Sequence, residues 1–254
     1  MALMNLKFYS QSLGMQTEVL AVVPQKNTDG EIGVKTAAGD RKYKCLYLLH
    51  GQSDDFSIWL RRTSIERYAA ACGICVVMPS AVRSYSTDMK YGEKYYTYIA
   101  KELPAIMAEF LNISDRREDT YVAGLSMGGY GALKIGLREC DRFCCAAGLS
   151  PVSDINQILT DKALSVPIFG DVEKVPAEED LFCLAEKNAE NPSRPRLFIG
   201  IGTEDFLYQD TLRLKEKLEE LNYDFTYRES PGSHCWEFWD EYIQYVLKWM
   251  LNPQ

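Results

Sequence analysis

The chain has 254 residues, of which 46% are hydrophobic and 25% are charged, so it is long enough to bury the core of one large globular domain. Its formal net charge of −8 argues against a nucleic-acid partner, because a phosphate backbone needs a cationic surface to displace its counterions. No apolar run approaches the roughly 20 residues of a membrane helix. The first ten residues lack the apolar core and cleavage site of a signal peptide, so we expect a cytoplasmic protein with no membrane partner.

The predicted elements alternate along the chain between strands and helices. Apolar or alternating runs indicate strands at Met15–Val23, Cys45–Leu49, Ile74–Met78, Thr120–Ala123, Phe143–Leu149, Arg196–Ile201 and Asp224–Glu229. Helical spacing indicates helices at Ile58–Ala71, Tyr95–Leu111, Tyr130–Arg138, Thr211–Leu221 and Trp236–Leu251. Gly73 is placed as a helix C-cap, Pro104 either starts a new helical segment or kinks the second helix, and Asn27–Arg41 is rich in turn formers. Such alternation predicts a mostly parallel sheet with helices on both faces.

Residues 151–195 interrupt this alternation. The segment holds five prolines and no clear strand, and it fits a cap-like insertion or a surface excursion equally well. No repeat, low-complexity stretch or linker divides the rest of the sequence. We therefore expect residues 1–254 to form a single domain, with 151–195 as a cap-like insertion.

The eight cysteines do not indicate disulfides or a metal. Several lie in apolar runs, where cysteine acts as a small hydrophobe, and a domain of this size does not depend on disulfides. Cys72 and Cys75 have CxxC spacing, but a zinc site would need further ligands, and Cys75 begins an apolar run typical of a buried strand. We expect reduced thiols, and neither a metal nor another cofactor.

Residues 124–128 read G-L-S-M-G, which has the form G-x-S-x-G. This motif alone is weak, since it occurs by chance in roughly one chain in ten of this length. Its context is specific, because an apolar strand leads into it and a helix leads out. There, a sharp turn exposes the serine hydroxyl above the sheet, and flanking glycines avoid collisions. Ser126 is therefore the candidate nucleophile, and the alternative is a structural turn with an idle serine.

A serine hydroxyl is a poor nucleophile at neutral pH and needs an adjacent base. The chain has only two histidines, His50 and His234. Serine hydrolases of the α/β-hydrolase fold carry their triad in the order Ser, acid, His, and only His234 follows Ser126. We predict that His234 is the general base; the alternative is a solvated loop histidine. His50 is expected to brace its own loop by hydrogen bonds.

The acid should follow a strand that lies between the serine and the histidine in sequence. Asp205 comes just after the expected strand that ends at Ile201, so it is the candidate that fixes the histidine tautomer. Glu204 is adjacent and chemically able, and it stays as the alternative. Asp154 and Asp171 fall within residues 151–195 and are less favoured.

The oxyanion of the tetrahedral intermediate requires preorganised donors. One is expected from the backbone N–H of Met127, directly after the nucleophile, and the other from the loop after an early strand. In that loop Gly51 lets the backbone approach the substrate oxygen, and the N–H of Gln52 is the expected donor.

Six short motifs together carry a resemblance to a known family. They are Leu48–Gly51 followed by Asp54, Asp55 and Trp59, then Tyr85–Asp88, Glu102–Pro104, Gly124–Gly129, Gly202–Asp205 and Gly232–His234. The chain resembles the esterase D-like group of α/β-hydrolases from about residue 9 to residue 249. That group includes tributyrin, acetyl and feruloyl esterases, S-formylglutathione hydrolases and mycolyltransferases. Among these, the sequence is most similar to the bacterial tributyrin esterases.

The resemblance implies a serine carboxylesterase that acts on a small-molecule ester, of short-chain acyl or carbohydrate-linked type. It supports the triad and the two backbone donors named above, and it implies substrate contacts near Gly51, Trp59 and Tyr85. For the aromatic residues Trp59 and Tyr85, a place in the core is an equal alternative. It also suggests a homo-oligomer. Three alternatives remain open: an acyltransferase, a thioesterase of the S-formylglutathione hydrolase type, and a non-catalytic binding protein that keeps the fold.

Overall fold

The computed structural model describes residues 1–25 and 42–252, so the turn expected at 27–41 lies outside the described residues. The strands within them are β1 (Ala2–Ser10), β2 (Met15–Val23), β3 (Cys45–Leu49), β4 (Cys75–Pro79), β5 (Thr120–Leu125), β6 (Cys145–Leu149), β7 (Arg196–Gly202) and β8 (Phe225–Ser230). All seven predicted strands are present, with ends that differ by at most two residues. The edge strand β1 was not predicted.

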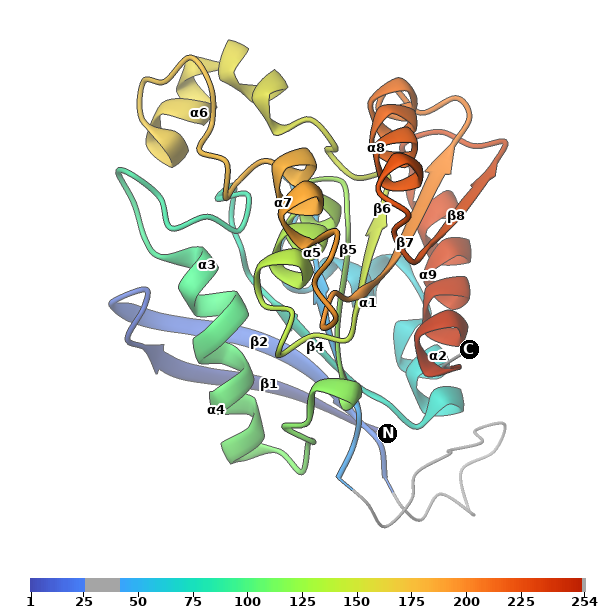
Figure 1. Cartoon of the computed structure of the whole chain (residues 1–254). Coiled ribbons are helices and arrows are strands. Elements are labelled where there is room, and N and C mark those ends of the chain that lie inside the picture. The colour runs from blue at the N-terminus through green and yellow to red at the C-terminus, as the bar shows by residue number, and fades with distance from the viewer. Residues whose placement is uncertain (26–41, 253–254) are drawn as a thin grey trace.

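These strands form one sheet in the order β1-β2-β4-β3-β5-β6-β7-β8 (Figure 1). Strand β2 runs antiparallel to both of its neighbours, whereas all the other neighbouring strands are parallel. The predicted mostly parallel sheet of the α/β-hydrolase fold is therefore confirmed.

The α-helices of the described residues are α1 (Ile58–Arg62), α2 (Ile65–Cys72), α3 (Tyr95–Thr97), α4 (Leu103–Phe110), α5 (Met127–Arg138), α6 (Lys162–Phe169), α7 (Leu181–Asn188), α8 (Tyr208–Glu220) and α9 (Trp236–Leu251). The first predicted helix is divided near Thr63, whose hydroxyl donates to Trp59 O at 2.6 Å. Gly73 caps α2 in the left-handed conformation, as predicted. Pro104 lies in the first turn of α4, and a π-helical turn (Tyr98–Glu102) separates α4 from α3. Pro104 thus belongs to a new helical segment.

Two layers of helices cover the sheet (Figure 1). Helices α1, α2 and α9 contribute to the apolar cluster on one face, and α4, α5, α7 and α8 to the cluster on the other. Along β3, Leu46 and Leu48 belong to the first cluster, whereas Tyr47 and Leu49 belong to the second. A strand buried on both faces explains the continuous apolar run that made β3 recognisable in the sequence.

Residues 151–195 contain a short 3₁₀ helix (Ile155–Thr160), α6 and α7, and no strand. Leu181 and Leu184 of α7 are buried in the same apolar cluster as α5. The segment also holds the loop before α3, because the amides of Lys90 and Tyr91 donate to carbonyls near the end of α6. It therefore packs over α5 and this loop; the single domain with a cap-like insertion stays a prediction.

Candidate active site

Ser126 lies at the sharp turn between β5 and α5. Its φ of 53° and ψ of −118° put a non-glycine residue in a strained conformation, which costs about 1–3 kcal/mol. The turn is held from β6, because the Ser126 amide donates to Leu149 O at 2.8 Å. Helix α5 begins at Met127, three residues earlier than predicted. The G-x-S-x-G segment thus has the geometry of a nucleophile elbow.

The two outer glycines of this motif are required by close backbone contacts. A Cβ at Gly124 would lie 2.3 Å from Gly128 O. A Cβ at Gly128 would lie 2.5 Å from His50 O, in the loop after β3. Because the obstructing atoms belong to the backbone, neither position accepts a side chain without moving the turn.

The three predicted triad side chains form one continuous hydrogen-bonded chain. His234 Nε2 is 3.0 Å from Ser126 Oγ, and His234 Nδ1 is 2.9 Å from Asp205 Oδ2 and 3.1 Å from Oδ1. An ionised carboxylate can only accept, so Nδ1 carries the proton and Nε2 is left to accept from the serine hydroxyl. This tautomer is the one that a general base needs.

The carboxyl of Asp205 is kept ionised by its donors. Burial opposes ionisation, but hydrogen bonds from His234 and from the amide of Leu207, at 2.9 Å, outweigh it and lower the pKa of Asp205. The hydroxyl of Ser150, just after β6, lowers the pKa further. Ser150 also accepts from the indole N–H of Trp239 at 3.1 Å. No sequence pattern indicates Ser150, because it becomes a neighbour of Asp205 only when β6 and β7 pair.

Glu204, the alternative acid, instead holds the histidine loop. Its Oε2 accepts from the Gly232 amide at 3.0 Å, and its own amide donates to Gly232 O at 2.9 Å. A Cβ at Gly202 would lie 2.1 Å from the same carbonyl oxygen, so the two loops are in close contact. Asp154 and Asp171 are ion-paired to Arg213 and Lys162 instead.

Two backbone amides are the predicted oxyanion donors, and neither has a hydrogen-bond partner among the described residues. The amide of Met127 is the first of α5 and has no partner within the helix. The amide of Gln52 donates to no other described residue. His50 braces this loop as expected: its Nε2 accepts from the Ala81 amide at 2.8 Å, so Nδ1 carries the proton and donates to Gly51 O at 2.7 Å. Burial lowers the pKa of His50 and keeps the ring neutral.

A cleft of about 650 Å³ opens over Ser126 and His234. Gly51 and Gln52 line it, as do Trp236, Trp239 and Phe206, whose ring centroid is 4.6 Å from that of His234. No lining residue comes from 151–195.

Two of the implied substrate contacts lie beneath the cleft, in the core. Trp59 and Tyr85 are only 1% and 3% exposed, and neither lines the cleft. Each uses its polar group to support the loop after β3: the Trp59 indole N–H donates to Leu49 O at 2.9 Å, and the Tyr85 hydroxyl donates to Gln52 Oε1 at 2.6 Å. Both aromatic side chains thus belong to the core and support this loop, whereas Gly51 lines the cleft; contact of Trp59 or Tyr85 with substrate stays a prediction.

The chain is similar to known esterases over almost its whole length. The model of the family described as "Putative esterase" matches residues 10–250. The chain belongs to this esterase family. An acetyl esterase of Caldicellulosiruptor saccharolyticus is 30% identical over 98% of both chains. An S-formylglutathione hydrolase of Arabidopsis thaliana is 27% identical over 82% of both.

Two solved structures from Staphylococcus aureus are each 34% identical and cover 99% of both chains. They are the fluorophosphonate-binding serine hydrolase FphF, with a TM-score of 0.89, and the S-formylglutathione hydrolase FrmB, with a TM-score of 0.86. The esterase is thus a carboxylic ester hydrolase of the α/β-hydrolase fold.

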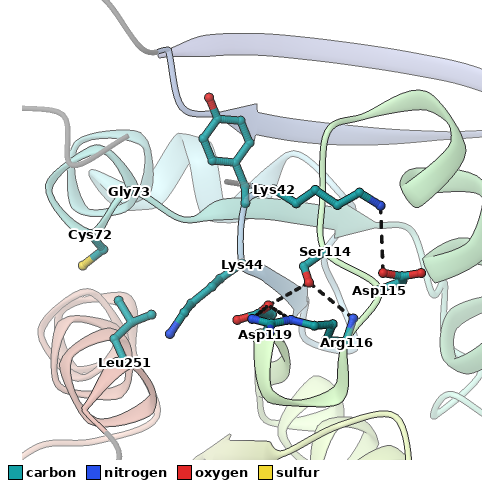
Figure 2. A pocket seen from close by; sticks show the side chains of 10 residues that line it. Lys42, Lys44, Cys72, Gly73, Ser114, Asp115, Arg116, Asp119 and Leu251 are labelled. Carbon is teal, nitrogen blue, oxygen red and sulfur yellow. Dashed lines mark hydrogen bonds and ion pairs between the residues drawn. The ribbon is translucent and has the colours of Figure 1, made fainter. Parts of the chain in front are cut away.

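A larger cavity of about 860 Å³ lies at the opposite edge of the sheet (Figure 2). Residues near the starts of β3, β4 and β5 line this cavity, whereas Ser126 follows the end of β5. Neither histidine lines it. Two of its three lining cations lie beside carboxylates: Lys42 is 3.9 Å from Asp115 and Arg116 is 2.7 Å from Asp119 (Figure 2). This cavity of the esterase lacks the groups for acyl transfer.

The cysteines, the possible metal ligands and the helices of the esterase bear on disulfides, metal binding and membrane insertion. All eight cysteines are free. Among the described residues, no group of three or more His, Cys, Asp or Glu side chains could hold a metal ion. No described helix combines the length and hydropathy needed to cross a membrane.

Proposed function

We propose that this protein is a serine carboxylesterase for short-chain acyl esters, with Ser126 as nucleophile, His234 as general base and Asp205 as the orienting acid. One observation carries the proposal. The Ser126 hydroxyl, on a strained turn, lies 3.0 Å from an imidazole whose other nitrogen contacts a buried carboxylate at 2.9 Å. Nucleophile, base and orienting group in mutual hydrogen-bond reach are the signature of covalent catalysis.

The reaction proceeds by two acyl transfers. Ser126 Oγ attacks the ester carbonyl while His234 Nε2 takes its proton, and the amides of Met127 and Gln52 receive the oxyanion. The carbon–oxygen bond to the alcohol then breaks, and the alcohol leaves with the proton from His234. Water repeats the sequence on the acyl-enzyme, which releases the acid and restores the serine.

Short acyl groups, acetyl above all, are the proposed substrates. The acetyl esterase relative spans almost the whole chain, which supports this choice. The cleft supports an alcohol portion of mixed polarity such as an acylated sugar, because Trp236 and Trp239 provide apolar walls beside the charged Arg62, Asp54 and Glu237. Initial rates over an ester panel that varies acyl length and includes acetylated and feruloylated sugars will test this preference.

A thioesterase activity of the S-formylglutathione hydrolase type is the second candidate. It is favoured by two relatives of that name, at 27% and 34% identity. The same steps serve a thioester, with a thiol as the leaving group. S-formylglutathione added to the panel compares the two substrates. An acyltransferase would differ only in the acceptor, and product analysis with an added sugar detects it.

The decisive variant is Ser126→Ala. We expect kcat to fall by about 10⁶, with unchanged thermal unfolding and no labelling by a fluorophosphonate. Ser80→Ala is the matched control, since Ser80 is a partly buried serine just after β4, at the same edge of the sheet. Undiminished hydrolysis by Ser126→Ala, or its continued labelling, would overturn the assignment.

We further propose a cytoplasmic location and a homo-oligomeric assembly that binds no nucleic acid. Eight free thiols and a net charge of −8 support the first and last of these. Size-exclusion chromatography with light scattering measures the assembly.

A further inference from the structure

The loop that follows β4 contains two adjacent strained residues. Tyr85 and Ser86 have φ values of 53° and 48°, in the left-handed region that favours glycine. Each such residue costs about 1–3 kcal/mol and persists only where its surroundings fix it. The contacts that hold this loop therefore indicate why the strained conformation is kept.

Helix α5, which starts directly after the nucleophile, holds the loop from below. The ammonium of Lys134 donates to Tyr85 O and to Thr87 Oγ1, both at 2.9 Å. Ser86 packs against Gly131, where a Cβ would lie 2.5 Å from the Ser86 hydroxyl. Lys134 is completely buried. A lysine is rarely buried in this way unless it is paired.

The partner of Lys134 is Glu179, which lies between α6 and α7. Lys134 Nζ is 2.6 Å from Glu179 Oε2, and Arg138 is 2.8 Å from Oε1. Burial lowers the pKa of Lys134 to about 8, against the opposing effect of Glu179, so the ammonium is retained at neutral pH. Replacement of such a buried pair by apolar residues is often neutral or stabilising, and in some proteins the pair instead specifies one conformation.

The conformation selected here places the Tyr85 hydroxyl on the loop after β3. That hydroxyl donates to Gln52 Oε1 at 2.6 Å. Burial raises the pKa of Tyr85 to about 12, so the hydroxyl remains a donor throughout the neutral range. Gln52 is the residue whose amide is proposed to receive the oxyanion, and this bond restrains it through its own side chain.

We infer that Tyr85 is a positioning residue for the reaction: it fixes Gln52 as an oxyanion donor, and the buried Lys134–Glu179 pair fixes Tyr85. The inference rests on the proposed function and adds residues that touch neither substrate nor triad. It also gives residues 151–195 an influence on the chemical step, although none of them lines the cleft.

The test begins with Tyr85→Phe, which removes one oxygen and keeps the ring. We expect kcat for p-nitrophenyl acetate to fall about tenfold, less than the 10²–10³ for complete loss of an oxyanion donor. KM should stay within about twofold, because the lost interaction acts only in the transition state. Tyr121→Phe is the control. Tyr121 is a buried residue near the start of β5 whose hydroxyl donates to Glu118 O at 3.0 Å, and loss of this hydroxyl should leave kcat unchanged.

A double-mutant cycle then separates positioning from general loosening. Gln52→Met removes the acceptor of the hydroxyl and keeps the side-chain length. If Tyr85 acts through Gln52, adding Tyr85→Phe to Gln52→Met should not lower kcat further. Losses that multiply would overturn the inference, and so would an unchanged kcat in Tyr85→Phe.

A second variant addresses the buried pair. Lys134→Met combined with Glu179→Gln removes both fully buried charges, and the amide oxygen of Gln can still accept from Arg138, which is partly exposed, so we expect this variant to fold. We expect its kcat to fall as much as that of Tyr85→Phe, with no further loss when the two are combined. All kcat values are to be divided by the number of sites that a fluorophosphonate titrates. Failure of the proposed function would appear as absent labelling of the wild type, whereas failure of this inference would appear as full labelling with undiminished kcat in Tyr85→Phe.

Discussion

Replacement of Asp205 by Asn is the most informative perturbation of the triad. The Asn oxygen can still accept from the Leu207 amide, now at 2.9 Å, but its NH₂ group then faces His234 Nδ1. The imidazole must accept at Nδ1 and carry its proton on Nε2, where it cannot take the proton of Ser126. We expect kcat to fall by about 10⁴, which is ~5.5 kcal/mol of transition-state stabilisation.

Initial rates with p-nitrophenyl acetate near pH 7.5, together with thermal unfolding, measure this effect. Glu204→Gln is the matched control one residue away. It keeps the side-chain carbonyl that can accept from the Gly232 amide, so its kcat should stay within about twofold of wild type. The reasoning fails if Asp205→Asn keeps more than about a tenth of wild-type kcat, or if Glu204→Gln proves the more damaging change.

Two further predictions concern stability. Gly128→Ala should lower kcat, and it should lower the free energy of unfolding by about 1–3 kcal/mol, because the new Cβ would lie 2.5 Å from His50 O. Gly92→Ala is the control, because the atoms nearest to its new Cβ belong to the flexible Met89 side chain. Thermal unfolding and initial rates should show a smaller effect for Gly92→Ala. Glu102 accepts from the Ser10 hydroxyl and two amides in the β1–β2 turn; burial raises its pKa, but these donors outweigh burial and lower it. The stabilisation is therefore present above about pH 4.5 and is lost as the pH falls through the lowered folded value. Glu102→Gln should accordingly cost about 1 kcal/mol at pH 7 and progressively less as the pH falls through that value. A gap between variant and wild type that does not narrow in acid would contradict this.

The parts of the fold that the sequence predicted are those specified by local patterns. Strands buried on both faces read as short apolar runs, and β5 followed by G-x-S-x-G identified the elbow at Ser126. The candidate base and acid followed because only one histidine comes after the serine, and Asp205 comes shortly after a recognisable strand. Both inferences used chain order, which a sequence displays directly.

Other parts depended on contacts between distant residues or on a weaker pattern. Strand β1 does alternate, because Met4, Leu6 and Phe8 lie on the face that packs against the apolar core. The exposed apolar residues Leu3 and Tyr9, on the other face, obscure this period in the sequence. Helix α5 begins three residues before its predicted start because packing overrides the poor helix propensity of its glycines.

The positions of Trp59 and Tyr85 show the same limit. An aromatic side chain beside a predicted site can equally be a wall of the cleft or part of the core. Here the hydrogen bonds from Trp59 to Leu49 O and from Tyr85 to Gln52 Oε1 hold both side chains in the core. The contact between Lys134 and Glu179 joins residues that are 45 positions apart, so no local sequence pattern predicts it.

The two hydrogen bonds between Glu204 and Gly232 join the loops that carry the proposed acid and the proposed base before any ester binds. Binding energy is then not consumed in assembling the proton-transfer path and remains available for orienting the scissile bond. An ester that reacts slowly should therefore do so because its carbonyl is poorly oriented in a preformed site, and not because it fails to induce the active arrangement of the site.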